Sequence, residues 1–254
     1  MKGLLHKAAI NLLLLPCLAV AGQVDPGEEV ISSVLAMGVA APGVAPPRGD
    51  ESEGPFKRLV IKNANVIDGA GAPTQGPVTI VIEGDRIVDL RGGGTGSLHL
   101  GEEDYDADTR VIDASGQYVI PGLIDAHAHF GTPSHAFGGA LTNPEYVAKL
   151  WLAHGITTVR EPGALMGLQW TLDHKQRSDS GEIAAPRIKV YALFPETMSS
   201  PDEARNWVRA VRRKGADGIK FLGAAPAVIE AAIGEARKLG MRTMYHHSQV
   251  SVAR

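Results

Sequence analysis

The sequence has little cysteine and little net charge, and each shortage excludes a class of protein. Its 254 residues include one cysteine, so neither a disulfide framework nor a cysteine-based zinc site is expected within the chain. With a formal net charge of −3, the chain lacks the excess of positive charge that is typical of proteins that bind nucleic acid. It also shows no polybasic patch that would bind a membrane surface. The remaining composition, 44% hydrophobic and 21% charged, is that of an ordinary globular protein.

Residues 1–21 have the pattern of a secretory signal peptide. Lys2 and Lys7 supply a positive start, an apolar run follows from Ala8, and residues 19–21 form a small-x-small cleavage site. The apolar run is about 14 residues long, too short to span roughly 30 Å of hydrocarbon, which disfavours a stable membrane anchor. We therefore expect cleavage after Ala21 and a secreted or periplasmic protein.

Composition divides the next part of the chain into two segments. Residues 22–55 are rich in glycine, proline and acidic side chains, which predicts a flexible linker apart from a short helix around Glu28 to Met37. Residues 56–118 contain three β-rich runs punctuated by Asp-Gly, Gly-Asp and Ser-Gly turn signals. This pattern predicts a small, partial β-sandwich unit.

Strand-like and helical runs alternate over residues 119–254. The best-marked helix extends from Pro201 to Lys214 and is followed by Gly215 as a stop signal. Repeated βα units with apolar strands predict a parallel sheet. No glycine-rich phosphate loop follows the first strand, so a dinucleotide-binding sheet lacks its main signal. The expected strands begin near Val119, Ile156, Ile188, Gly218 and Thr243.

The strongest chemical signal is the sequence VIPGLIDAHAHF at residues 119–130. Residues two apart on an extended strand point to the same face, so His127 and His129 are expected to project together from one strand end. Two imidazoles placed in this way can both reach one divalent cation at about 2.0–2.1 Å. The alternative is a pair of ordinary strand-end histidines, because a bare His-x-His triplet often arises by chance.

This motif and its surroundings resemble the amidohydrolase superfamily. The resemblance covers about Lys57 to Arg254, is most specific in PGLIDAHAH, and continues in GITTVREPG at 155–163 and GADGIKF at 215–221. It is closest to the imidazolonepropionase-like and prolidase-like branch of secreted metal-dependent hydrolases. Those proteins place a metal-bearing (β/α)8 TIM-type barrel after a small β-sandwich. The resemblance therefore implies an α/β fold with an incomplete barrel of about five strands.

The resemblance also implies further metal ligands. Lys220, on the predicted fourth strand, matches a lysine that carbon dioxide carboxylates so that it bridges two metal ions. Burial lowers the pKa of a lysine and favours the neutral amine that this reaction needs; a lysine that snorkels from a strand end is the alternative. His246 follows the fifth strand, where another ligand stands, with His247 as its competitor. The implied cofactor is a pair of divalent ions, zinc being expected, held by His127, His129, Lys220 and His246.

The other histidines carry weaker expectations. His99 and His174 lie among polar residues and are expected at the surface. His154 precedes a glycine at a helix end, where histidine interacts with terminal carbonyl groups. His135, in the loop after the first barrel strand, is a candidate for substrate contact.

The implied reaction is hydrolysis of a carbon–nitrogen bond in an amide, a peptide or a cyclic amide. A divalent pair lowers the pKa of a bridging water and polarises a carbonyl oxygen, so that hydroxide can attack. A general base must take the proton, and the resembling families use an aspartate on strand eight, with another metal histidine on strand six. Since about five strands are expected, we expect neither residue in this chain, assign no catalytic residue, and expect no appreciable turnover from the chain by itself.

Three interpretations remain open. In the first, the chain is the amino-terminal part of a secreted metal-dependent hydrolase that acts on a small molecule or a short peptide. In the second, it is a truncated, non-catalytic remnant that can still bind metal. The third, a periplasmic sugar- or peptide-binding module, leaves Lys220 and the histidine pair without an explanation. Metal content distinguishes the third interpretation from the other two.

Overall fold

The computed structural model describes residues 25–50, 52–92, 105–132 and 140–246, which form two compact units. The sheet unit comprises the described part of residues 48–122. The barrel unit comprises the described parts of residues 25–47 and 123–246. The predicted signal peptide lies outside the described residues. Among the described residues, no helix is both long enough and apolar enough to cross a membrane.

The sheet unit is one five-stranded mixed sheet. β1 pairs antiparallel with β2, which pairs antiparallel with β3, whereas β4 and β5 both run parallel to β1. Val60, Ala64 and Ile80 are buried on the two central strands. The strand bounds are β1 Arg58–Val66, β2 Gln75–Glu83, β3 Arg86–Gly92, β4 Thr109–Asp113 and β5 Tyr118–Val119.

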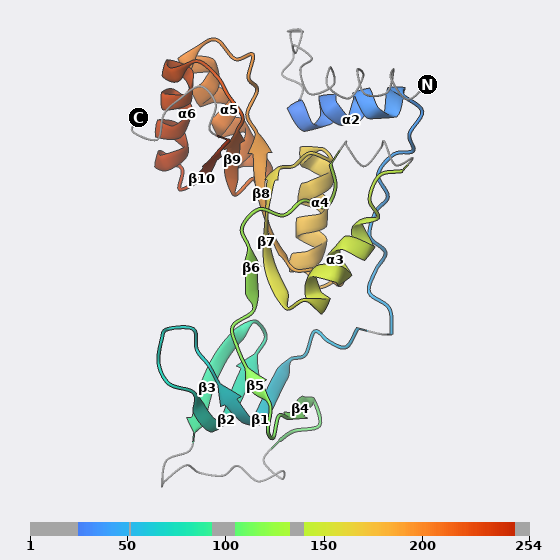
Figure 1. Cartoon of the computed structure of the whole chain (residues 1–254), viewed down its shortest axis with the longest axis vertical. Coiled ribbons are helices and arrows are strands. Elements are labelled where there is room, and N and C mark those ends of the chain that lie inside the picture. The colour runs from blue at the N-terminus through green and yellow to red at the C-terminus, as the bar shows by residue number, and fades with distance from the viewer. Residues whose placement is uncertain (1–24, 51, 93–104, 133–139, 247–254) are drawn as a thin grey trace. The chain divides into compact units, whose positions relative to one another are not determined.

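The barrel unit alternates strands and helices, as its sequence predicts. Its five strands pair in chain order, β6-β7-β8-β9-β10, and every pairing is parallel. The predicted α/β fold with five parallel strands is therefore confirmed, and its course can be followed in Figure 1 from green through yellow to red. The bounds are β6 Leu123–Asp125, α3 Pro144–Ala153, β7 Ile156–Gly163, α4 Leu168–Asp179, β8 Arg187–Leu193, α5 Pro201–Lys214, β9 Gly218–Phe221, α6 Pro226–Lys238 and β10 Arg242–Tyr245.

The first barrel strand begins later than the sequence predicts. The run expected to open the barrel at Val119 divides into β5, which pairs with β1 in the sheet unit, and β6, which pairs with β7. Pro121 lies between the two strands. Proline has no backbone N–H for a strand ladder, so an apolar run that contains it does not continue as one strand. The structure accordingly separates its two units between Gly122 and Leu123.

The core of the barrel unit lies between the strands and the helices that follow them. Ile188, Val190 and Ala192 on β8 are fully buried. Beyond the end of β8, the ring of Phe194 lies 5.1 Å from that of Trp207 on α5 and 4.8 Å from that of Phe221 on β9, measured between centroids. These contacts attach α5 to the sheet.

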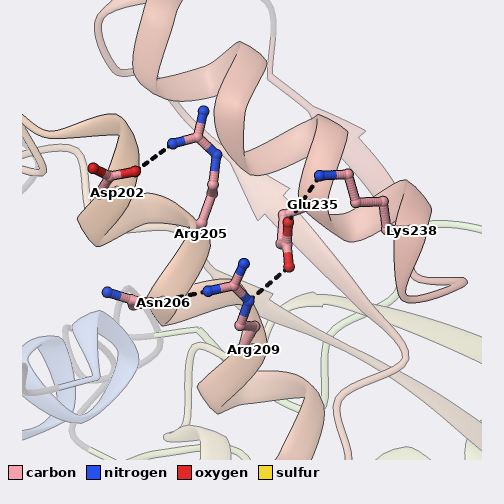
Figure 2. A network of polar contacts seen from close by, with 6 residues as sticks. All are labelled: Asp202, Arg205, Asn206, Arg209, Glu235 and Lys238. Atoms are coloured by element: carbon pink, nitrogen blue, oxygen red, sulfur yellow. Dashed lines mark hydrogen bonds and ion pairs between the residues drawn. The ribbon is translucent and has the colours of Figure 1, made fainter.

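A polar network on the outer helices connects α5 with α6 (Figure 2). Arg209 of α5 donates from Nε to Glu235 of α6 at 2.7 Å, and Lys238 lies 3.4 Å from the same carboxylate. The pKa of Glu235 lies below its usual range, mainly because Arg209 donates this hydrogen bond. Glu235 is only 5% exposed, so both cations compensate a carboxylate that is largely removed from water.

The segment predicted as a flexible linker is partly ordered against the barrel unit. It contains α2, Pro26–Ala36, whose first turn is capped by the side chain of Asp25. Ile31 and Val34 of this helix are buried. Further along the segment, the carbonyl of Gly43 accepts a hydrogen bond of 3.1 Å from the indole of Trp170 on α4. The apolar residues within this acidic, glycine-rich composition therefore have a packing role.

His174 is buried, which corrects the expectation that it lies at the surface. It is 1% exposed, and its ring lies 3.9 Å from that of Trp170, centroid to centroid. Its Nδ1 lies 2.9 Å from the carbonyl oxygen of Trp170 and must donate, which leaves Nε2 to accept from the backbone N–H of Ala45 at 3.2 Å. The polar neighbours in sequence do not indicate this burial, because Asp173 is exposed and Lys175 pairs with Asp217 at 2.6 Å.

We expect this histidine to make the stability of the fold depend on pH. Burial lowers the pKa of His174 in the folded state. As the pH falls through about 6.5, the histidine of the unfolded state takes up a proton before the buried one does. The free energy of unfolding should therefore fall as the pH falls below 6.5, by at most about 1.4 kcal/mol per pH unit for this group. Urea unfolding between pH 5 and 8 measures the slope.

The variant His174→Gln provides the comparison for that slope. Glutamine retains a donor and an acceptor but does not titrate in this range. The variant should show a shallower decline than the wild type between pH 6.5 and 5. Equal slopes would show that other groups cause the decline.

Candidate metal site

The turn after β6 carries the predicted histidine pair and is fixed by hydrogen bonds on both sides. Within the turn, Oδ1 of Asp125 accepts from the backbone N–H of His127 at 2.9 Å. Towards β7, Nε of Arg160 donates to the carbonyl oxygen of Ala126 at 2.9 Å, and the carbonyl of Arg160 accepts from the N–H of Ala128 at 3.0 Å. The turn therefore lies at the carboxyl end of the strands, where barrel enzymes carry their sites.

His127 and His129 lie side by side. Their ring centroids are 5.3 Å apart and the rings meet edge to face at 75°. The pKa of His127 is lowered, chiefly by burial and then by the charge of Lys220 and by His129 and His246. Of the predicted ligands, the histidine pair follows β6, Lys220 lies on β9, and His246 follows β10.

Lys220 is a buried lysine on β9, between β8 and β10. It is 5% exposed and pairs with Leu193 on β8 and Met244 on β10. Burial lowers the pKa of its amine. Within the part of the chain that the structure describes, no carboxylate forms an ion pair with it, so nothing there offsets the cost of burying the charge.

His246 follows β10, and its backbone N–H donates to the carbonyl of Phe221 at 2.8 Å. The side chain is exposed. Its competitor His247 lies outside the described residues, as do His99 and His135. His154 behaves as its sequence predicts, with Nδ1 at 2.8 Å from the carbonyl oxygen of Leu150 at the end of α3.

The donor set fits a divalent ion in part. Among the described residues, no three His, Cys, Asp or Glu side chains are grouped closely enough to hold an ion by themselves. His127 and His129 are suited to supply two ligands, because neutral imidazole is a common ligand of Zn²⁺ and related ions. An ammonium cannot coordinate a cation, so Lys220 fits such a site only after it has lost its positive charge.

Glu161 is the residue of this site that sequence reasoning missed. It lies on β7 and is 2% exposed, and its two oxygens have different partners. Oε1 lies 2.8 Å from Nδ1 of His129, and Oε2 accepts from the backbone N–H of Phe130 at 2.7 Å. Burial raises the pKa of this carboxyl, and the two hydrogen bonds counteract part of that effect. An acidic residue in the strand GITTVREPG is the signal that could have pointed to it.

Comparison with known proteins gives related sequences and related folds. The chain is 37% identical over 102 residues to adenine deaminase 2 of Desulfotalea psychrophila, a match that covers 40% of this chain and 14% of the deaminase. The structure of molinate hydrolase matches with a TM-score of 0.58 at 21% identity, covering 76% of this chain and 54% of that one. A Xaa-Pro dipeptidase with bound methionine matches with a TM-score of 0.56 at 22% identity, covering 74% and 56%. No family model matches the chain.

The chain is related to the amidohydrolase superfamily. The resemblance drawn from PGLIDAHAH is thereby confirmed, and the Xaa-Pro dipeptidase shares the fold of this chain. The likeness to an imidazolonepropionase stays a prediction. The chain spans 14% of the deaminase and about half of each structural neighbour, so their activities do not transfer directly to it.

Proposed function

We propose that this chain forms part of the metal site of a hydrolase that acts on a carbon–nitrogen bond in an amide, a peptide or a cyclic amide. The observation that carries the proposal is the pair of imidazoles 5.3 Å apart after β6, in the unit whose strand β9 carries the buried Lys220. The names of two matched proteins, a deaminase and a dipeptidase, describe chemistry at carbon–nitrogen bonds. The pattern of residues 1–21 supports the further proposal that the protein is secreted or periplasmic.

In this proposal, His127 and His129 hold a divalent ion, zinc being the proposed metal, and His246 provides a further ligand. Divalent ions, when bound, polarise a carbonyl oxygen and lower the pKa of water. Lys220 contributes through its neutral amine, which burial favours. The amine nitrogen forms a bond to the carbon of carbon dioxide and releases a proton, so the product is an anionic carbamate. Such a group can bridge two cations, whereas the ammonium cannot.

A second candidate function is metal binding without catalysis. Asp125 and Glu161 both accept hydrogen bonds from the turn that carries the histidine pair. These bonds give both carboxylates a role in supporting the turn. Carboxylates engaged in this way favour metal binding at the turn without requiring either of them to act as a general base.

The experiment that tests the proposal is reconstitution of the full chain with zinc, followed by dialysis and measurement of retained metal. The wild type should retain zinc in stoichiometric amount. The double variant His127→Ala/His129→Ala should bind at least about 100-fold more weakly, because loss of two ligands exceeds the 10–100-fold effect of losing one supporting group. Isothermal titration gives the two affinities.

The control is His154→Ala, which removes an exposed histidine at the end of α3. Its zinc content should equal that of the wild type. A folded wild-type chain that retains no zinc would favour the binding-module interpretation. Unchanged stoichiometry in the double variant would show that the ion is held elsewhere.

A further inference from the structure

We propose that Glu161 is a positioning residue that fixes the tautomer of His129, so that Nε2 of this histidine carries the free lone pair. The inference rests on the proposed function, because a metal ion is what the lone pair would bind. The pattern His-x-His identifies two histidines, but it does not show which ring nitrogen of each one carries the proton and which has the free lone pair.

The geometry around Glu161 leaves each of its oxygens one role. Oε2 lies 2.7 Å from the backbone nitrogen of Phe130, which is always a donor, so this oxygen accepts. Oε1 lies 2.8 Å from Nδ1 of His129. A carboxylate can only accept hydrogen bonds, so Nδ1 carries the proton and Nε2 does not. Metal-bound histidines usually donate from their second nitrogen to a carboxylate or a carbonyl group in this way.

A purely structural role can be separated from the positioning role. A structural role requires a buried acceptor for the N–H of Phe130 and a side chain of the size of glutamate. Glutamine has the same shape and supplies that acceptor through its carbonyl oxygen. Its second terminal atom is then an amide nitrogen, which donates towards Nδ1 of His129. The imidazole must accept there, and its own proton moves to Nε2.

The variant Glu161→Gln should therefore reverse the tautomer of His129 while it preserves the packing. The test uses the full chain without metal, labelled with ¹⁵N-histidine, at pH 8, where imidazoles are neutral. Long-range ¹H–¹⁵N correlation distinguishes the tautomers, and His129→Gln assigns the signals. The wild type should show a proton on Nδ1 of His129, and Glu161→Gln a proton on Nε2. Glu161→Asp, which retains a carboxylate, should keep the wild-type tautomer.

Zinc titration of the same proteins gives the second readout. Glu161→Gln should bind zinc about 10–100-fold more weakly than the wild type, and Glu161→Asp should recover part of this loss. The matched control is Glu235→Gln, which changes a glutamate of similar burial in the α5–α6 network (Figure 2). It should alter neither the tautomer nor the zinc affinity.

The outcomes separate this inference from the proposed function. A wild-type His129 with its proton on Nε2 overturns the inference, even if the glutamine variant does not fold, because Glu161 is then the donor. An unchanged tautomer in a folded Glu161→Gln also overturns it. If the wild type shows the expected tautomer but binds no zinc, the tautomer assignment stands and the metal function fails.

Discussion

Replacement of Phe130 by alanine is expected to lower the free energy of unfolding by about 3–5 kcal/mol. The side chain is 1% exposed and follows the histidine pair directly. Its ring lies 4.9 Å from that of Trp151 on α3 and 5.9 Å from that of Trp170 on α4, measured between centroids. One side chain thus joins the turn after β6 to two helices, and its removal leaves a cavity among large rings that cannot easily collapse.

The same substitution should also weaken the candidate site. The backbone N–H of Phe130 donates to Glu161, which in turn contacts His129. When the ring no longer holds this turn in place, both hydrogen bonds lose their fixed geometry. We therefore expect Phe130→Ala to reduce zinc affinity, and Phe130→Leu, which fills more of the space, to have a smaller effect on both stability and binding.

Urea unfolding followed by circular dichroism measures the change in stability. The matched control is Ile124→Ala on β6, since Ile124 is apolar and close in sequence but 68% exposed. It should change the free energy of unfolding by no more than about 0.5 kcal/mol. A loss below about 1 kcal/mol for Phe130→Ala would show that the ring is not part of the core.

The middle of the barrel unit could be predicted because β8 and β9 are buried on both faces and are largely apolar in sequence. The structure starts β7 at Ile156 and β9 at Gly218, as predicted. It starts β8 at Arg187 and β10 at Arg242, one residue before the predicted positions. The first strand was predicted to begin too early, because the sequence is apolar on both sides of Pro121. Hydropathy describes side chains only and does not show that proline lacks a backbone N–H.

The candidate site could be predicted only where its geometry is local. The common face of His127 and His129 follows from the two-residue period of an extended chain, and the structure places the rings 5.3 Å apart. Glu161 contacts His129 from 32 residues away, and His174 accepts from a backbone N–H 129 residues away in sequence. No period or motif encodes such pairs, because they depend on which strand and which segment the fold places alongside.

The second large effect is expected at Gly218, the first residue of β9. A Cβ atom built there would lie 2.6 Å from the backbone carbonyl oxygen of Arg242 and would overlap the ring of Tyr191. The ring could rotate, but the carbonyl belongs to the neighbouring strand, whose Arg242 pairs with Gly218. Gly218→Ala should therefore lower the free energy of unfolding by about 3 kcal/mol, the upper part of the range for overpacked sites.

This strain should reach the candidate site because Lys220 lies two residues further along the same strand. If β9 moves away from β10, the lysine moves with it, and zinc affinity should fall together with stability.

The matched control is Gly234→Ala in α6, where a Cβ would meet nothing within 4 Å. Alanine favours a helix over glycine by roughly 0.5–1 kcal/mol, so this variant should be more stable than the wild type. The same chemical change is thus expected to have opposite signs at the two positions. Equal stabilities for Gly218→Ala and Gly234→Ala in urea would mean that β9 and β10 separate at little cost.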